Sequence, residues 1–201
     1  KKGDHFMTSR ARPKRADAIG FPAAMSPRYS TQPVTRQADA AIVMQGPIWT
    51  DDDFTVETLR LYRAALPETR IILSTWNDTP DALLAPIAGL GVDIVLSAKP
   101  DLSGPFNVNM QIASAGAGMK RAEALGATWA LKTRTDQRLY HPTFMSGLVS
   151  LAELMPPTGE AARGQRYRIF GLGHGTLKFV PYHLTDQTVF GHIEDMTADW
   201  T

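Results

Sequence analysis

The sequence predicts an α/β fold, with a mostly parallel, Rossmann-like sheet flanked by helices and short antiparallel strands in the C-terminal third. Three observations predict it. Short apolar runs alternate with amphipathic stretches through the middle of the chain. Turn-forming Gly, Pro, Asn and Asp residues punctuate them. Four strands alternating with helices are the pattern of a parallel sheet with right-handed crossovers. The last third changes to short apolar pieces with glycines between them, which indicates antiparallel strands.

The first strand is predicted over residues 40–44, where Ala-Ala-Ile-Val-Met leads into Gln45 and a Gly46-Pro47 turn. A helix is predicted within residues 50–67. Three aspartates supply its N-cap and first turn, apolar residues recur at helical spacing, and a proline ends it. The chain therefore begins its domain with a buried strand, a tight turn and an amphipathic helix.

The same alternation then repeats. A second buried strand is predicted over residues 69–76, a short proline-interrupted helix within 77–91, and a third strand over 92–100. The segment 104–126 reads as a loop followed by a helix of small residues that closes at a glycine.

A fourth strand is predicted over residues 127–140, a helix with proline at both ends over 141–157, and short strands over 167–191. Residues 1–38 are rich in Pro, Arg, Ser and Gln without periodicity. We therefore expect an irregular N-terminal lead-in before one catalytic domain over 39–201. Because the chain stops without an obvious helix end, we also expect the native protein to continue past it.

Composition narrows the function classes. The chain has 201 residues, 43% of them hydrophobic, a net charge of +1 and no cysteine. This balance gives no case for a nucleic-acid partner, and the lack of cysteine excludes disulfides, Cys-ligated zinc and thiol nucleophiles. No apolar run reaches the roughly 18 residues that span a bilayer, and the polar N-terminus lacks a signal core. We therefore expect a cytoplasmic protein.

The stretch LKTRTDQRLY concentrates charge. Lys132, Arg134, Asp136 and Arg138 occupy every second position. In an extended chain such positions share one face, so three cations and one carboxylate would line one side of the segment. The set could grip an anionic ligand, or it could form internal ion pairs. The sequence by itself leaves both interpretations open.

Polar residues lie at the ends of the four predicted parallel strands. Since ligands of open α/β sheets bind outside the carboxyl ends of the strands, these residues are the candidate site. An amide-rich loop before the helix of small residues joins them, because free N–H groups at a helix start favour an anion. The candidates are Gln45, Gly46, Pro47, Ser74, Thr75, Trp76, Asn107, Asn109, Gln111, Lys132, Arg134, Asp136 and Arg138.

This combination suits a nucleoside diphosphate. Arg134 or Arg138 could bind phosphate oxygens bidentately. Asp136 could hold a divalent cation, Mn²⁺ or Mg²⁺, which prefers oxygen ligands and would neutralise diphosphate charge. Trp49 or Trp76 could stack on the base, although a tryptophan in the position of Trp76 is more often part of the core.

Several of these segments resemble the WavE lipopolysaccharide-synthesis family over roughly residues 41–196. The matching pieces are VMQGPI, TLRLYRAALPETRIILSTW, NVNMQIASAGAGMKRAEALGATWALKTRTDQRLY and PYHLTDQTVFG. That family is similar to GT-A glycosyltransferases, which use nucleotide-sugar donors to build surface polysaccharide. The resemblance implies a GT-A-like fold, with RTDQR in the place of the metal-binding D-x-D motif and LTDQTVFG on the acceptor side. Only Asp136 is a carboxylate in that place, so Arg134 and Arg138 would share the work of a metal.

The resemblance thus implies a glycosyltransferase that moves a sugar from a nucleoside diphosphate sugar to a saccharide or lipid-linked saccharide. Asp186 is the first candidate for the general base, because an acceptor hydroxyl loses a proton as it attacks. Glu194 and Asp195 are second candidates. A peripheral contact with the inner face of the inner membrane would suit a lipid-linked acceptor. A nucleotidyltransferase on a similar sheet and a non-catalytic binding domain of a polysaccharide assembly complex are the alternatives.

Overall fold

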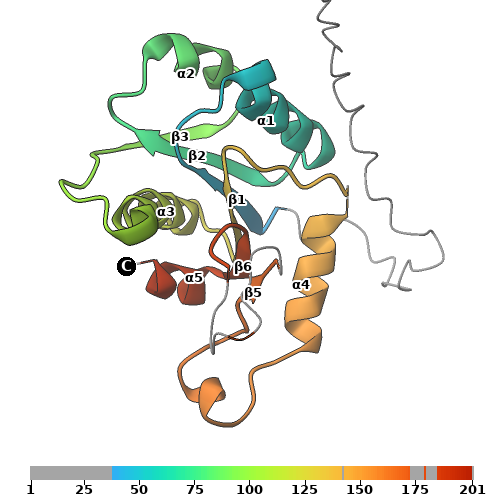
Figure 1. The fold of residues 1–201 in the computed structure, drawn as a ribbon. Coiled ribbons are helices and arrows are strands. Elements are labelled where there is room, and N and C mark those ends of the chain that lie inside the picture. The colour runs from blue at the N-terminus through green and yellow to red at the C-terminus, as the bar shows by residue number, and fades with distance from the viewer. Residues whose placement is uncertain (1–37, 142, 173–178, 180–184, 201) are drawn as a thin grey trace, which may run out of the picture. The chain divides into compact units, whose positions relative to one another are not determined.

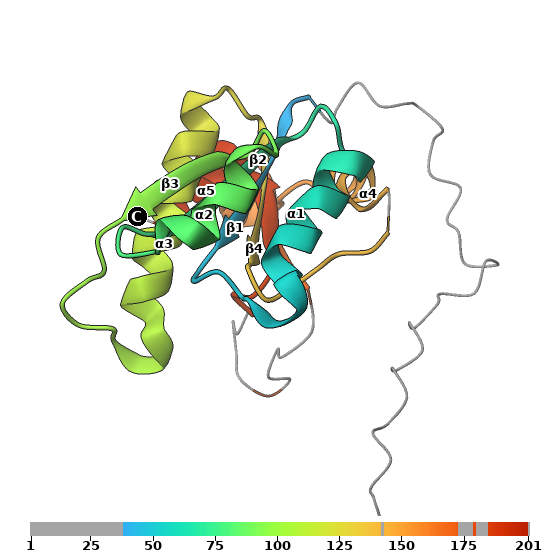
Figure 2. The same ribbon diagram turned by 90° about the horizontal axis from the view of Figure 1, so that it is seen from above.

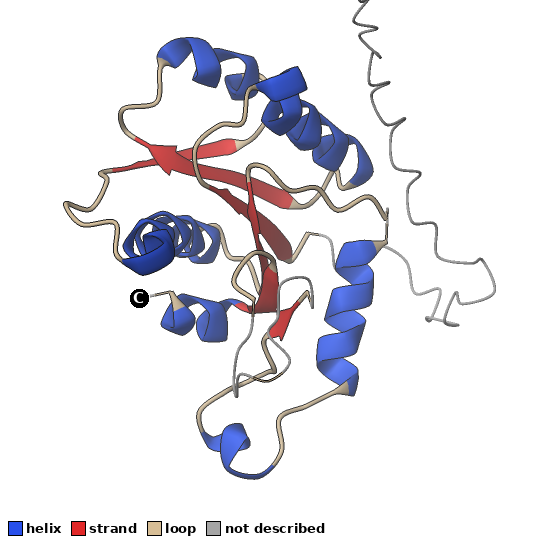
Figure 3. Cartoon of the chain, in the orientation of Figure 1, coloured by secondary structure: helices blue, strands red, loops and turns tan. Residues whose placement is uncertain are grey.

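The computed structural model describes residues 38–141, 143–172, 179 and 185–200. Apart from Ala38, the expected N-terminal lead-in lies outside these ranges, so the boundary between 38 and 39 stays a prediction. Within them the chain forms a six-stranded sheet, in the order β3-β2-β1-β4-β6-β5, with helices on both faces (Figure 1). Figure 3 shows the same layers by secondary structure.

The mixed sheet confirms the predicted fold class. Neighbouring pairs among the first four strands are parallel, and β6 pairs antiparallel with both β4 and β5. The strands are β1 (Ala40–Gln45), β2 (Arg70–Trp76), β3 (Asp93–Ser97), β4 (Trp129–Arg134), β5 (Phe170–Gly171) and β6 (Val189–His192).

Five α-helices and three short 3₁₀ turns connect the described strands. The helices are α1 (Phe54–Ala65), α2 (Asp81–Ala88), α3 (Val108–Ala124), α4 (Phe144–Leu154) and α5 (Ile193–Asp199). The 3₁₀ turns are Asp51–Asp53, Pro105–Asn107 and Gly159–Arg163. The first two precede α1 and α3, and the third follows α4.

The two faces of the sheet carry separate cores, because successive side chains of a strand point to opposite faces. On β1, Ile42 and Met44 pack with residues of α1, α2 and α4. Ala41 and Val43 pack with residues of α3 and α5. Figure 2 shows the sheet running between α3 on one side and α1 on the other.

One predicted boundary needs correction, and one helix was not predicted. The strand expected over residues 127–140 is β4, which ends at Arg134, because the chain turns at Thr135 and Asp136. Asp136 and Arg138 therefore lie beyond the strand, and the predicted alternation of charges along one face does not continue to them. No element was predicted for residues 193–199, which form α5. That helix packs Ile193 and Met196 into the core beside α3, so tertiary burial rather than local propensity stabilises it.

Candidate functional site at the carboxyl edge of the sheet

The parallel topology brings three predicted strand ends to one edge. Gln45 of β1 lies opposite Ser74 of β2 on one side and opposite Arg134 of β4 on the other. The convergence expected of these three residues from the parallel-sheet prediction is therefore present. The edge is where open α/β sheets bind their ligands.

Ser74 and Gln45 are buried and bound to α3. The Ser74 hydroxyl donates to the carbonyl oxygen of Ser114 at 2.6 Å, and the Ser114 hydroxyl donates to Oε1 of Gln45 at 2.7 Å. Since these bonds satisfy the buried polar groups, they fix the helix against the ends of β1 and β2. Both residues lie at the floor of the edge rather than on its surface.

The last two residues of β2, Thr75 and Trp76, are both buried. Thr75 is buried, and its hydroxyl shares a 3.2 Å hydrogen bond with that of Thr79. Trp76 is only 5% exposed and lies in the core, whereas Trp49 is 46% exposed. Of the two tryptophans considered for stacking on a base, Trp49 is therefore the accessible one.

The Gly46-Pro47 turn is tied to the loop after β4. Gly46 has φ +117°, a conformation that favours glycine, and a Cβ there would lie 3.2 Å from the Thr135 hydroxyl. That hydroxyl donates to the carbonyl oxygen of Pro47 at 2.6 Å, and the Thr135 amide donates to the carbonyl of Gln45 at 3.2 Å. The turn thereby holds the Arg134–Asp136 segment in place.

Arg134 and Asp136 form a bidentate ion pair across that turn. Nε of Arg134 donates to Oδ1 of Asp136 at 2.8 Å, and NH2 donates to Oδ2 at 2.5 Å. The guanidinium holds the pKa of the Asp136 carboxyl below its usual range, while the carboxylate raises the pKa of Arg134. Both side chains are partly exposed. The pair is therefore accessible from solvent.

Lys132 is fully buried on the α3 and α5 face of β4. Its ammonium donates to the carbonyl oxygen of Asp186 and, at 3.3 Å, to Oε1 of Gln111 on α3. It also lies 4.6 Å from the centroid of the Trp200 ring, in cation–π geometry. One buried cation thus joins three segments that are distant in the sequence.

Burial lowers the pKa of the Lys132 ammonium to about 8, because the charged form loses its hydration. The negative charge of Asp186 acts in the opposite direction, and Arg134 adds to the lowering. Burial also disfavours the charged form of Asp199 and so raises the pKa of that carboxyl, an effect that Lys132 partly offsets. The ammonium therefore links these segments and also influences the pKa of a nearby carboxyl group.

Arg138 lies apart from the other charged side chains of the 132–138 segment. Its guanidinium donates to the Thr58 hydroxyl at 2.8 Å and to the carbonyl oxygen of Phe54 at 3.2 Å, both on α1. It also lies 4.5 Å from the centroid of the Phe54 ring. The structure thus separates Arg138 from Lys132 and Arg134, and it joins the loop after β4 to α1.

Of the three amides predicted in a loop, only Asn107 precedes α3, on a strained turn, whereas Asn109 and Gln111 lie in the first turn of the helix. Phe106 and Asn107 have φ of +52° and +61°, which non-glycine residues rarely adopt, and the Phe106 side chain is 98% exposed. The side-chain amide of Asn109 donates to the carbonyl oxygen of Leu102 at 3.0 Å. Of the three predicted amides, only Gln111 has a described hydrogen bond that brings it to β4, through Lys132.

The candidate bases fall at opposite edges of the sheet. Asp186 precedes β6 and lies at the carboxyl edge of β4, with its backbone fixed by Lys132. Glu194 and Asp195 follow β6, so they lie at the other edge. There Asp195 accepts from the backbone amides of Arg166 and Tyr167, at 2.9 and 2.8 Å. This placement favours Asp186 over the two second candidates.

The carboxylate set does not fit a resident metal ion in this arrangement. Both oxygens of Asp136 accept hydrogen bonds from Arg134. In the described part of the chain, no group of three or more His, Asp or Glu side chains is placed to hold a cation. A divalent ion needs several oxygen ligands, so it would have to take most of them from a ligand or from water.

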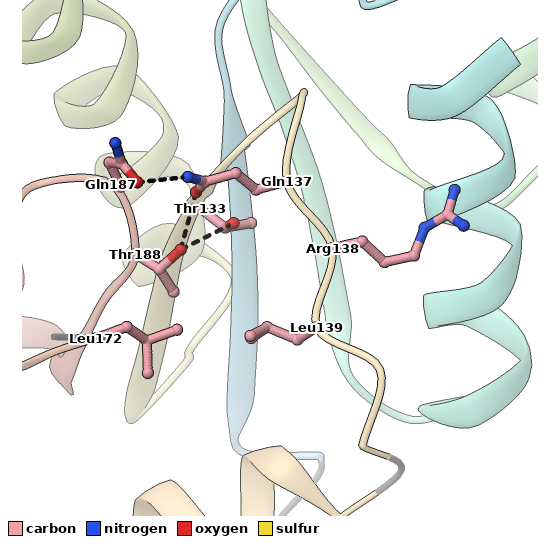
Figure 4. Close-up of a pocket in the computed structure, with 7 residues that line it drawn as sticks. All are labelled: Thr133, Gln137, Arg138, Leu139, Leu172, Gln187 and Thr188. Carbon is pink, nitrogen blue, oxygen red and sulfur yellow. Dashed lines mark hydrogen bonds between the residues drawn. The ribbon is translucent and has the colours of Figure 1, made fainter. Parts of the chain in front are cut away.

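Sequence reasoning missed an uncharged set on the opposite face of β4. Four polar side chains point toward one another there, as Figure 4 shows: Thr133, Gln137, Gln187 and Thr188. They border a cavity of about 310 Å³. A signal was present, because Thr-Asp-Gln occurs at both 135–137 and 185–187. The sequence alone does not show that the two tripeptides are neighbours, because the pairing of β6 with β4 is what brings them together.

No helix in the described ranges has the length and apolar character needed to cross a membrane.

A parallel sheet that gathers cations, amides and a carboxylate at the ends of its strands has the arrangement of α/β proteins that bind ligands at this edge. The family model for WavE lipopolysaccharide synthesis matches residues 40–201. The chain therefore belongs to the WavE lipopolysaccharide synthesis family.

Two solved structures are similar to parts of the chain. The 4-diphosphocytidyl-2C-methyl-D-erythritol synthase from Anaerococcus prevotii DSM 20548 matches 80% of this chain and 74% of its own, with 11% identity and a TM-score of 0.50. Mannosyl-3-phosphoglycerate synthase from Rubrobacter xylanophilus matches 55% of this chain and 35% of its own, with 16% identity and a TM-score of 0.33. No match to a curated protein was found. At such identity the first likeness shows the fold alone.

Proposed function

We propose that this protein is a GT-A-type glycosyltransferase that moves a sugar from a nucleoside diphosphate sugar to a saccharide or lipid-linked saccharide acceptor in bacterial surface polysaccharide synthesis. One observation carries the proposal. The segment that matches the WavE lipopolysaccharide synthesis family folds into a mostly parallel sheet. The carboxyl edge of its parallel strands presents the partly exposed Arg134–Asp136 pair directly beside the end of β1.

The donor diphosphate would bind at Arg134. A guanidinium offers a planar fork of N–H donors that matches phosphate oxygens as well as it matches a carboxylate. Binding would exchange the partner of Arg134 from Asp136 to the diphosphate. Asp136 would then accept hydrogen bonds from hydroxyls of the donor ribose or sugar, and Trp49 would offer its exposed face to the base.

Transfer breaks the bond between the anomeric carbon and the diphosphate oxygen, and the diphosphate leaves with the electron pair. Arg134 would stabilise that developing charge. The acceptor hydroxyl forms the new bond to the anomeric carbon and loses its proton to Asp186 if the reaction inverts configuration. Arg134 binds both oxygens of Asp136 in the unliganded protein, so this carboxylate would become available to donor hydroxyls or to a divalent cation only after the exchange.

The direct test is a thermal-shift panel of UDP, CDP, GDP and ADP and their sugar conjugates, with and without manganese. We expect at least one nucleoside diphosphate to stabilise the protein, by about 2.7 kcal/mol near 100 times its dissociation constant. Binding to none would overturn the proposal and favour a non-catalytic domain. A larger shift with manganese would show that the nucleotide binds together with the metal ion.

The two carboxylate roles are tested by isosteric amides. Asp136→Asn should abolish transfer without unfolding the protein, and Asp186→Asn should lower turnover more than donor affinity. Asp93→Asn and Glu194→Gln are matched controls, because Asp93 forms an exposed pair with Arg121 and Glu194 lies at the opposite edge. Unchanged turnover in Asp186→Asn would remove it as the base.

A further inference from the structure

The cavity on the α1 and α4 face of β4 differs chemically from the charged edge beside it. It has a volume of about 310 Å³, and its described lining residues are Thr133, Gln137, Arg138, Leu139, Leu172, Gln187 and Thr188. None of these lining residues is acidic. Thr133 and Lys132 are neighbours on one strand, so their side chains point to opposite faces of the sheet. The cavity and the buried ammonium are therefore on different sides of β4.

The polar wall of the cavity is an ordered network of amides and hydroxyls. Nε2 of Gln137 donates to Oε1 of Gln187 at 2.9 Å, and the Thr188 hydroxyl donates to Oε1 of Gln137 at 3.0 Å. The Thr133 and Thr188 hydroxyls lie 3.4 Å apart. A carboxamide can make four hydrogen bonds. The mutual bonds fix both carboxamides while leaving each with capacity toward a ligand.

The cation on the rim does not face this network. Arg138 points away from the four polar side chains in Figure 4, toward α1, where the Thr58 hydroxyl and the Phe54 carbonyl accept its hydrogen bonds. A phosphate placed in the cavity would meet amides and hydroxyls without a guanidinium directed at it. The lining therefore favours an uncharged ligand.

The remaining wall is apolar. Leu139 and Leu172 line the cavity, and the backbone of Leu139 is fixed because its amide donates to the Tyr62 hydroxyl at 2.9 Å. A wall of hydroxyls and amides opposite an apolar wall matches the two surfaces of a sugar ring, which presents hydroxyls at its edge and C–H groups on its faces. Ligand sites commonly combine apolar lining with a few placed polar groups in this way.

We propose that this cavity binds an uncharged sugar ring of the acceptor, with Gln137 and Gln187 as the residues that select it. The inference rests on the proposed glycosyltransferase function. Gln187 follows Asp186 directly in the chain, and Lys132 fixes the backbone of Asp186. An acceptor ring held by Gln187 would thus place a hydroxyl on the segment that carries the proposed base.

The test uses the full chain and saturation-transfer NMR with glucose, galactose and N-acetylglucosamine, and with glucose 6-phosphate as the charged comparison. We expect at least one neutral sugar to bind more tightly than the phosphorylated one. Gln137→Leu and Gln187→Leu should each weaken that binding about tenfold, the loss expected for a pair of neutral hydrogen bonds. Gln165→Leu, an exposed glutamine outside this cavity, should not change it.

The donor is measured in the same variants. Nucleoside diphosphate binding should be unchanged in Gln137→Leu and Gln187→Leu, and Gln187→Ala replaces the second variant if leucine prevents folding. No binding of neutral sugar, binding insensitive to both glutamines, or tighter binding of glucose 6-phosphate would each overturn the inference. If a diphosphate binds while the sugars do not, only the acceptor inference fails. If the sugars bind while no diphosphate does, the proposed donor function fails instead.

Discussion

The two faces of the sheet are packed differently. On one face, α3 approaches the sheet closely because it has small residues: a Cβ on Gly118 would overlap Val43 Cγ1, and one on Gly116 would lie 2.5 Å from the carbonyl oxygen of Trp200. On the other face, larger side chains of α1 and α4 fill the core, and a Cβ on Gly147 of α4 would meet nothing within 4 Å.

This difference extends to the polar groups at the edge. The tight face encloses the Lys132 ammonium and uses it to join α3, α5 and the segment before β6. On the opposite face of β4 there is a cavity whose polar wall consists of amides and hydroxyls. The comparison shows that a charged residue in a sequence motif need not indicate a ligand-binding site. A buried cation must be paired with groups inside the protein before it can bind anything else.

The largest effect is expected at the exposed ion pair between these faces. Arg134→Met should lower turnover about 10²- to 10³-fold, because it removes a donor that stabilises the leaving diphosphate. The pKa of the Asp136 carboxyl should rise in the same variant, since Arg134 is what lowers it. Steady-state kinetics and NMR titration of Asp136 measure the two effects. Arg121→Met removes a comparable Arg–Asp pair away from the site and should change neither turnover nor that pKa.

The next effect concerns the tight face. The pKa of Lys132 falls from 10.5 in an unfolded chain to about 8 in the folded one, so the unfolded state holds the proton more firmly. The cost of burying the charge is fully present below about pH 8. The free energy of unfolding should therefore rise as the pH increases from about 8 to about 10.5, by about 3 kcal/mol from this residue.

Lys132→Met isolates that contribution. Urea denaturation of both proteins at several pH values should show the rise in the wild type and not in the variant, after other titrating groups cancel in the difference. Lys120→Met, an exposed lysine on α3, should keep the wild-type pH dependence. Parallel curves for the wild type and Lys132→Met would show that the ammonium is not held in a dry site.

The smallest effects compare the helices. Gly118→Ala should destabilise the protein by about 1–3 kcal/mol, because the new methyl group forces α3 away from Val43. Gly147→Ala on α4 meets open space and should stabilise it by about 0.5–1 kcal/mol through helix propensity. Thermal denaturation of the two variants measures both. Equal effects would contradict the difference in packing between the faces.

Much of the fold could be predicted from local sequence patterns. The four parallel strands and the helices between them follow from apolar runs, caps and prolines, and the parallel order then places Ser74, Gln45 and Arg134 at one edge. The candidate site could be predicted only in part. The alternating charges of 132–138 lie on one face only while the strand lasts, and β4 ends at Arg134.

What could not be predicted depends on contacts distant in the sequence. Helix α5 is seven residues long and relies on burial beside α3, which no local signal reports. The cavity exists because β6 pairs with β4 in a register that places Lys132 opposite Val189, and so brings Gln187 within hydrogen-bond distance of Gln137. Such a register is fixed by the folded sheet rather than by the spacing of either segment.

The central claim is that Arg134 exchanges Asp136 for the diphosphate of a donor. A crystal structure with the nucleoside diphosphate that gives the largest thermal shift tests it most directly. The account predicts diphosphate oxygens within hydrogen-bond distance of the Arg134 guanidinium at the carboxyl edge of β4, with the bidentate contact to Asp136 broken. A structure in which Arg134 and Asp136 remain paired while the diphosphate lies elsewhere would contradict it.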